Sequence, residues 1–297
     1  VLIPVTLSAP SGKPVTVEYA VTGGTAESGK QYALKGTSLT FAPGETLKEL
    51  ELTVKDDGMS RDDRTVAVSL KDPKNAVLGG TAVHTYTIID SNPGPAVTFT
   101  TAGQQVKESA GTATIGVELS AISGKDVTVP LMVSGTAKTP GNYTAPGPVV
   151  IKAGTKSASI TVQVSANGLN EDDKTVAVSM GVPANAAQGK VATSTVTIVN
   201  TDPEPTVSFG SGSSSGEETT SPVRLEVKLS APSGKPVTVG YAVTGGTAIL
   251  GKDYALAAGV LSFEPGETSK AIEIDIKNHG IYDDDKTITL ALKNPKN

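Results

Sequence analysis

One segment of the sequence occurs twice almost unchanged and a third time in altered form. Residues Leu7–Ala26 return at Leu229–Ala248 with a single difference, Glu18 against Gly240. A diverged copy, LSAISGKDVTV, begins at Leu119. The copies are spaced by about 110 residues, the length of a complete β-domain rather than of a solenoid repeat. The sequence therefore predicts three domains of one type, at residues 1–93, 94–203 and 204–297.

Short runs of alternating aliphatic and polar residues recur in every copy. Examples are Leu50–Val54, Ser157–Val164 and Ile272–Ile276. Strict alternation is typical of a strand with one buried and one solvated face. Turn-forming Gly (32) and Pro (19) are frequent, whereas only 4% of the residues are aromatic. We expect an all-β chain of tandem seven-stranded antiparallel β-sandwiches with aliphatic cores.

Two proline-containing segments, Asp90–Pro95 and Asn200–Pro205, join the copies. Because proline fixes its own φ and restricts the preceding residue, such links are semi-rigid spacers. We therefore expect the domains to form an elongated rod.

Each outer copy is one strand short of the middle copy. The first lacks the opening strand that the other copies have before this segment, and the third stops at Leu292–Asn297, a point after which the first copy continues through Ala76–Asp90. Bare strand edges favour pairing. Two readings follow: the sequence is a segment of a longer array, or an adjacent chain adds the missing strands and builds a head-to-tail filament. Either way, we expect neighbouring repeats as partners.

Composition and charge exclude several classes of function. The net charge of −5 argues against nucleic acid as a partner, no apolar run is long enough to span a bilayer, and the absence of Cys excludes thiolate catalysis and Cys–zinc sites. Residues Gly212–Gly216 match G-x-S-x-G, but no helical pattern follows them. The two histidines, His84 and His279, fall in different copies. We predict that the protein is not an enzyme.

Several short motifs recur in a fixed order. They are Gly24–Ala26, Gly251–Tyr254, Phe41–Glu45, Asp56–Asp57, Glu171–Asp173 and Thr195–Ile198. In this order they resemble the Calx-beta domain family over essentially the whole chain. The resemblance implies an immunoglobulin-like sandwich, and some family members bind Ca²⁺ at one end of it.

The resemblance also implies a set of candidate Ca²⁺ ligands, because calcium takes six to eight oxygens, several from carboxylates. Carried over by position, the candidates are Asp56, Asp57 and Asp90 in the first copy, Glu108, Glu171 and Asp202 in the second, and Glu218, Asp253 and Asp283 in the third. Other ligand positions hold Gln31, Arg61, Arg64, Asn142, Ala166, Asn167, Lys174, Asn278, His279 and Lys286. Cations at such positions repel Ca²⁺. The sequence therefore supports at most a weak calcium site, and it suggests no other cofactor.

These observations favour a non-enzymatic structural array on a cell surface or elsewhere outside the cell, which provides reach, spacing or filament assembly. One alternative is a Ca²⁺-binding module that regulates or stiffens the junctions between domains. Another is an adhesin whose variable loops contact a surface partner.

Overall fold

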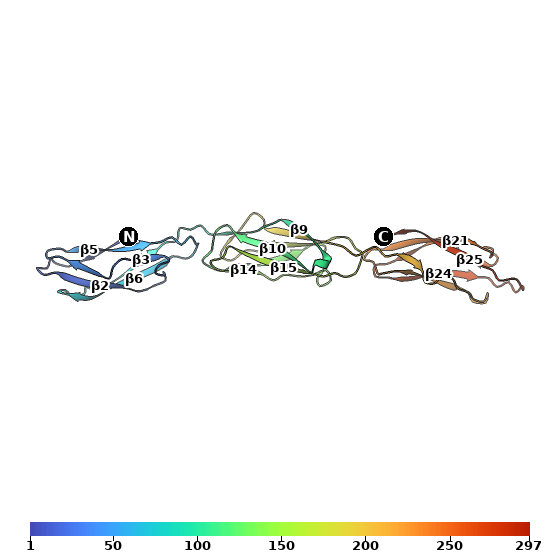
Figure 1. Ribbon diagram of the computed structural model, residues 1–297, viewed down its shortest axis with the longest axis horizontal. Helices are drawn as coiled ribbons and strands as arrows, with labels where there is room; N and C mark the ends of the chain where they lie inside the picture. The colour runs from blue at the N-terminus through green and yellow to red at the C-terminus, as the bar shows by residue number, and fades with distance from the viewer.

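The computed structural model describes residues 1–297 and shows three β-sandwiches arranged end to end (Figure 1). Apart from one 3-10 turn, η1 (Glu108–Ala110), every regular element is a strand, which confirms the predicted all-β class. None of the elements is a helix of the length and apolar character that crossing a membrane requires.

The middle domain is the most complete of the three. Its first sheet has the order β13-β15-β10-β8-β17 and its second β12-β16-β18-β9, with the pair β11-β14 alongside. The strands are β8 (Ala96–Phe99), β9 (Gly103–Lys107), β10 (Thr112–Leu119), β11 (Val127–Val129), β12 (Leu131–Ser134), β13 (Tyr143–Thr144), β14 (Val149–Ile151), β15 (Ser157–Val164), β16 (Lys174–Met180), β17 (Ala187–Gln188) and β18 (Thr193–Val199). Nineteen buried aliphatic and aromatic residues form one core between the sheets, as alternation predicts.

The first domain pairs the sheets β1-β5-β3 and β4-β2-β6-β7. Its strands are β1 (Leu2–Thr6), β2 (Val15–Gly24), β3 (Tyr32–Leu34), β4 (Ser38–Phe41), β5 (Leu47–Val54), β6 (Arg64–Lys74) and β7 (Val83–Ile88). The third domain pairs β19-β20-β24-β22 with β23-β21-β25. Its strands are β19 (Val207–Phe209), β20 (Val223–Leu229), β21 (Val237–Gly246), β22 (Tyr254–Ala255), β23 (Gly259–Phe263), β24 (Ser269–Ile276) and β25 (Ile288–Lys296).

Two alternating segments of the middle domain each form two strands rather than one. The opening strand splits, because β8 pairs with β10 in one sheet whereas β9 pairs in parallel with the closing strand β18 in the other. The segment Val127–Ser134 is interrupted at Pro130, which has no N–H to donate to a ladder, and so forms β11 and β12.

In the outer domains, strands that are paired on both sides in domain 2 stand at a sheet edge, as the strand count predicts. Domain 1 has no equivalent of β8 and β9, so that β7 pairs only with β6. Domain 3 has no equivalent of β18, so that β25 pairs only with β21. Ile198 on β18 is consequently buried, whereas Ile88, at the same position on β7, is partly exposed.

The repeated Gly-Thr-Ala motif is structural. In domain 1, Gly24 has φ +114, and a Cβ there would meet the Thr65 carbonyl oxygen. The Thr25 hydroxyl accepts a hydrogen bond from the Thr65 N–H at 3.0 Å. The motif therefore fastens the loop that follows β2 onto the start of β6. The other copies repeat this contact at Gly135–Ala137 with Thr175 and at Gly246–Ala248 with Thr287.

Candidate functional site

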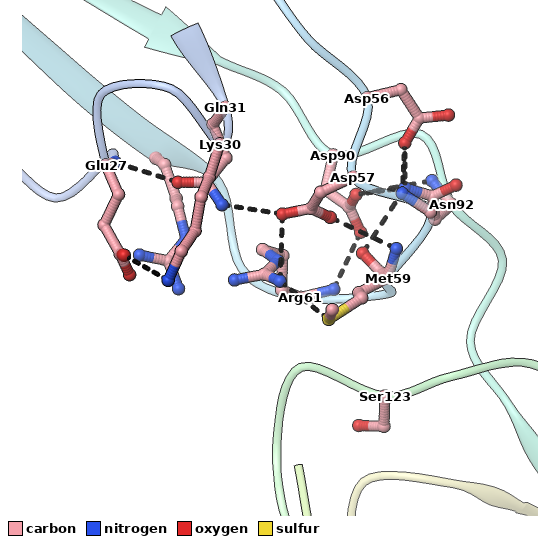
Figure 2. Close-up of polar contacts among 12 residues, drawn as sticks. Glu27, Lys30, Gln31, Asp56, Asp57, Met59, Arg61, Asp90, Asn92 and Ser123 are labelled. Carbon is pink, nitrogen blue, oxygen red and sulfur yellow. Dashed lines mark hydrogen bonds and ion pairs between the residues drawn. The ribbon is translucent and has the colours of Figure 1, made fainter. Parts of the chain in front are cut away.

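The predicted ligand residues of domain 1 gather at its distal end, the end that faces domain 2. Figure 2 shows Asp57 between two donors. The Gln31 side-chain amide donates to Asp57 Oδ2 at 2.7 Å, and Arg61 Nη2 lies 2.9 Å from the same oxygen. The Arg61 side chain is only 13% exposed, so its charge is held inside the loop cluster. An internal guanidinium thus neutralises the central carboxylate.

The remaining acids of this end are also occupied by protein donors (Figure 2). The Asn92 side-chain amide donates to Asp56 Oδ1 at 2.9 Å and to Asp90 Oδ1 at 3.2 Å. Its bond to Asp56, helped by the Gly58 N–H, lowers the pKa of that carboxyl. The backbone N–H of Arg61 donates to Asp90 Oδ2 at 2.9 Å. The loops are therefore closed by hydrogen bonds of the chain itself.

Domain 3 also holds a cation against its carboxylates, here a lysine at the position of Arg64 rather than of Arg61. Lys286 Nζ lies 3.1 Å from Asp253 Oδ1 and 2.8 Å from Asp283 Oδ2, and His279 Nε2 lies 3.3 Å from Asp253. The Ile249 N–H and then Lys286 lower the pKa of Asp253, while Lys286 lowers that of Asp283. Both carboxylates raise the pKa of Lys286.

The remaining predicted ligand of domain 3, Glu218, takes no part in these contacts. It is exposed in the loop between β19 and β20, and neither Lys286 nor His279 pairs with it.

Domain 2 differs, because its distal end leaves oxygen atoms without donors. Glu171 accepts hydrogen bonds from Asn142 and Asn167, and buried Glu108 accepts one from the Thr201 N–H at 2.7 Å. Three further buried oxygens have no partner: Asn170 Oδ1, Asn200 Oδ1 and Asp202 Oδ2. All three belong to the junction with domain 3, where the Asn170 and Asn200 side-chain amides both donate to the Asp202 carbonyl.

These differences decide where calcium fits. Ca²⁺ needs an oxygen shell without a competing cation. Domains 1 and 3 place Arg61 or Lys286 against their carboxylates, so that their residues do not fit the ion. No three His, Cys, Asp or Glu side chains are grouped as a metal centre. The distal end of domain 2 offers three unpartnered oxygens, although Lys174 Nζ lies 3.5 Å from Glu171 Oε2 at the same end.

The same distal loops hold the next domain. At the first joint, the Gly124 N–H donates to the Ser60 carbonyl at 2.8 Å, and the Ser60 N–H donates to the Ile122 carbonyl at 3.1 Å. Lys125 Nζ lies 2.5 Å from Asp62 Oδ1. A Ser-Gly-Lys turn of domain 2, marked by Ser123 in Figure 2, thus docks against the loop that contains Arg61.

The second joint repeats the first with different residues. The Gly234 N–H donates to the Asn170 carbonyl at 2.9 Å, and Lys235 Nζ lies 2.8 Å from Asp172 Oδ1. Position for position, Asn170 replaces Ser60 and Asp172 replaces Asp62. The sequence signal for this role is the occurrence of the Ser-Gly-Lys motif at the same place in all three copies.

The sequence features that could suggest catalysis lie apart. Gly212–Gly216 is an exposed loop with no helix after it. His84 lies on β7 of domain 1, whereas His279 contacts Asp253 and Asp283 in domain 3.

Comparison with known proteins identifies the family. The Calx-beta domain model matches residues 1–92, 90–202 and 200–297, which together span the chain. Among solved structures, the chain is similar to calcium binding domain CBD12 of CALX1.1, at 21% identity over 67% of this chain and 80% of that one, with a TM-score of 0.35. It is also similar to the apo-form Calx CBD1 domain, at 17% identity over 37% of this chain and 100% of that one, also at 0.35.

The assignment rests on the family match, since structural scores this low add nothing to it. Calx-beta domains are usually non-catalytic, and no catalytic domain is found in this chain. The three sandwiches, their repeated motifs and the match over the whole length lead to one conclusion: the chain belongs to the Calx-beta family and consists of three tandem Calx-beta domains.

Proposed function

We propose that this chain is a non-enzymatic spacer of a protein at the cell surface or elsewhere outside the cell, and that it sets distance and direction between the parts it connects. The observation that carries the proposal is the repetition of one joint. Both joints use the same Ser-Gly-Lys turn, the same backbone acceptor position and the same Lys–Asp pair.

Such joints favour one orientation between neighbouring domains. A hydrogen bond contributes roughly 0.5–1.5 kcal/mol, and an exposed ion pair adds little. Short proline-containing linkers keep turn and loop close together, so that the two elements do not have to find each other by diffusion. The docked arrangement is therefore the main population, whereas a single joint still yields to force.

Small-angle X-ray scattering of the full chain tests this proposal. Gly124 and Gly234 have ordinary φ values, but a Cβ at these positions would lie 3.0 Å from Arg61 Cβ and 2.9 Å from Glu171 Cβ. The double variant Gly124→Val/Gly234→Val should undock both joints, shorten the maximum dimension and broaden its distribution. Gly212→Val is the matched control, because nothing lies near its Cβ. Equal scattering curves for both variants would contradict the proposal.

A second candidate function, favoured by the unpartnered oxygens of Asn170, Asn200 and Asp202, is a divalent cation at the second joint. There the ion would be held mainly by the Asp202 carboxylate and the two amide oxygens, and it would stiffen that joint alone. Titration calorimetry with CaCl₂ tests it against an Asp202→Asn variant. Heat that disappears in the variant supports the ion, and no heat from the unchanged protein removes this candidate.

A further inference from the structure

The first domain also carries a Ser-Gly-Lys turn, Ser11–Lys13, at its outer end. The Lys13 N–H donates to Ser11 Oγ at 3.1 Å, and the Gly44 N–H donates to the Ser11 carbonyl at 2.9 Å. The docked turn of domain 2 is held by the same two bonds, from Lys125 to Ser123 Oγ at 3.0 Å and from Gly154 to the Ser123 carbonyl at 2.8 Å. The free turn is thus preformed in the docking geometry.

Domain 1 itself gives no reason for a glycine at position 12. Gly12 lacks the positive φ that favours glycine, and no atom lies within 4 Å of a Cβ built there. At Gly124 and Gly234 the restriction comes from the docked neighbour, whose Arg61 or Glu171 would be in contact with that Cβ. A turn with this glycine is therefore suited to receive another domain.

The distal loop of domain 3 supplies the complementary surface. Asn278 Oδ1 accepts from the Gly280 N–H at 2.7 Å, as Asp56 Oδ1 does from Gly58 in domain 1. Tyr282 occupies the position of Ser60 and Asn170, and its side chain is fully exposed at 101%. Asp284 occupies the position of the two aspartates that pair with lysine across the joints.

We propose that the Ser11–Lys13 turn of one chain docks onto the distal loop of domain 3 of a second copy, forming a third joint head to tail. In this joint the Gly12 N–H donates to the Tyr282 carbonyl and Lys13 pairs with Asp284. The proposal rests on the joints of the proposed function and requires no exchange of strands.

The strength of this contact follows from the internal joints. Within the chain, the linker holds turn and loop at an effective concentration in the millimolar range. Two separate chains have no linker between turn and loop. We therefore expect measurable association only when the protein concentration itself approaches the millimolar range. A covalent trap suits a contact of this strength, and the chain contains no Cys that would interfere.

The trap is the double variant Ser11→Cys/Tyr282→Cys. Its internal counterpart is Ser60→Cys/Ser123→Cys, which joins two residues that form a parallel β-bridge in the first joint. Bridge partners lie about 5 Å apart at Cα, within the range of a disulfide. Under mild oxidation at high protein concentration, we expect a ladder of dimers and trimers on non-reducing gels for the trap, and an internal disulfide within monomers for the counterpart.

Adding Gly12→Val to the trap distinguishes docking from random cross-linking. Because that Cβ is free in the single chain, the variant should fold and melt as its parent does, yet the ladder should decrease about tenfold, while Gly212→Val should leave it unchanged. A ladder insensitive to Gly12→Val, or no ladder while the internal disulfide forms, overturns the head-to-tail contact alone. Failure of the internal disulfide overturns the joint geometry, and with it both proposals.

Discussion

The first and second domains share one fold but differ in what closes them. In domain 2 the closing strand β18 lies between β16 and β9, and at its distal end three buried oxygens have no donor. In domain 1 the closing strand β7 has a bare edge, and the Arg61 guanidinium occupies the distal end. The same sequence pattern therefore gives two outcomes. Domain 2 has a well-covered core and unpartnered oxygens at its distal end, whereas domain 1 has a less covered core and a distal end whose charge is neutralised by Arg61.

The two domains should differ most in the stability that they lose when a core isoleucine is shortened. Ile198 and Ile88 occupy the same position, but only Ile198 is buried, at 4% exposure. Ile198→Ala should lower the free energy of unfolding of domain 2 by about 3 kcal/mol, the range for a buried Ile→Ala change. Ile88→Ala should cost domain 1 only about 1 kcal/mol, because a partly exposed side chain loses less burial. Hydrogen exchange in the full chain, resolved by domain, measures both. Equal losses would mean that β9 does not protect the core.

A smaller difference in lost stability is expected when the cation at the distal end of each domain, Arg61 or Lys174, is removed. Arg61 and Asp57 are 13% and 15% exposed and 2.9 Å apart, whereas Lys174 lies 3.5 Å from Glu171 and is 28% exposed. Arg61→Met should lower the free energy of unfolding of domain 1 by about 2 kcal/mol, because it leaves a largely buried carboxylate with one donor fewer. Lys174→Met should cost domain 2 less than about 1 kcal/mol. Denaturant unfolding compares the two, and a larger loss for Lys174→Met would contradict the assigned role of Arg61.

The smallest effect is expected from pH, which should change how firmly the second joint holds domains 2 and 3 together. Lys235 lowers the pKa of Asp172 below its ordinary value of 3.8, and Asp172 raises that of Lys235. A carboxyl with a lowered pKa stabilises the docked state fully above its unfolded pKa and loses that effect as pH falls through the lower, docked value. The joint should therefore loosen below about pH 4. Scattering at pH 3 and pH 7, with Asp172→Asn as the control that is already loosened at pH 7, checks this. An unchanged particle length in both would show that the pair does not hold the joint.

Most of the fold could be predicted from the sequence, because period-two alternation states directly which face of each strand is buried. The repeat located the three copies, and a tyrosine that recurs at one position in each copy, as Tyr32, Tyr143 and Tyr254, lies in the core at exposures of 5%, 6% and 4%. The split of the opening strand between two sheets was not predicted, because alternation gives the period of a strand but not its pairing partner.

The candidate site was predicted only as a set of residue types. Position in the family pattern brought Asp56, Asp57 and Asp90 to one end of domain 1, and the structure places them there. It could not show that Asn92 satisfies them, because this partner comes from the linker, or that Arg61, four residues after Asp57 in the same loop, turns its guanidinium onto that carboxylate.

The sequence by itself determined the all-β class, the three copies, the aliphatic cores and the family, since these depend on local period and on the order of motifs. Only the tertiary structure decided what each distal end does. The partners of a carboxylate, and the reason for a glycine such as Gly124, lie in segments distant along the chain or in the next domain. Hydrogen bonds and close contacts depend on distance in space, which a linear pattern does not contain.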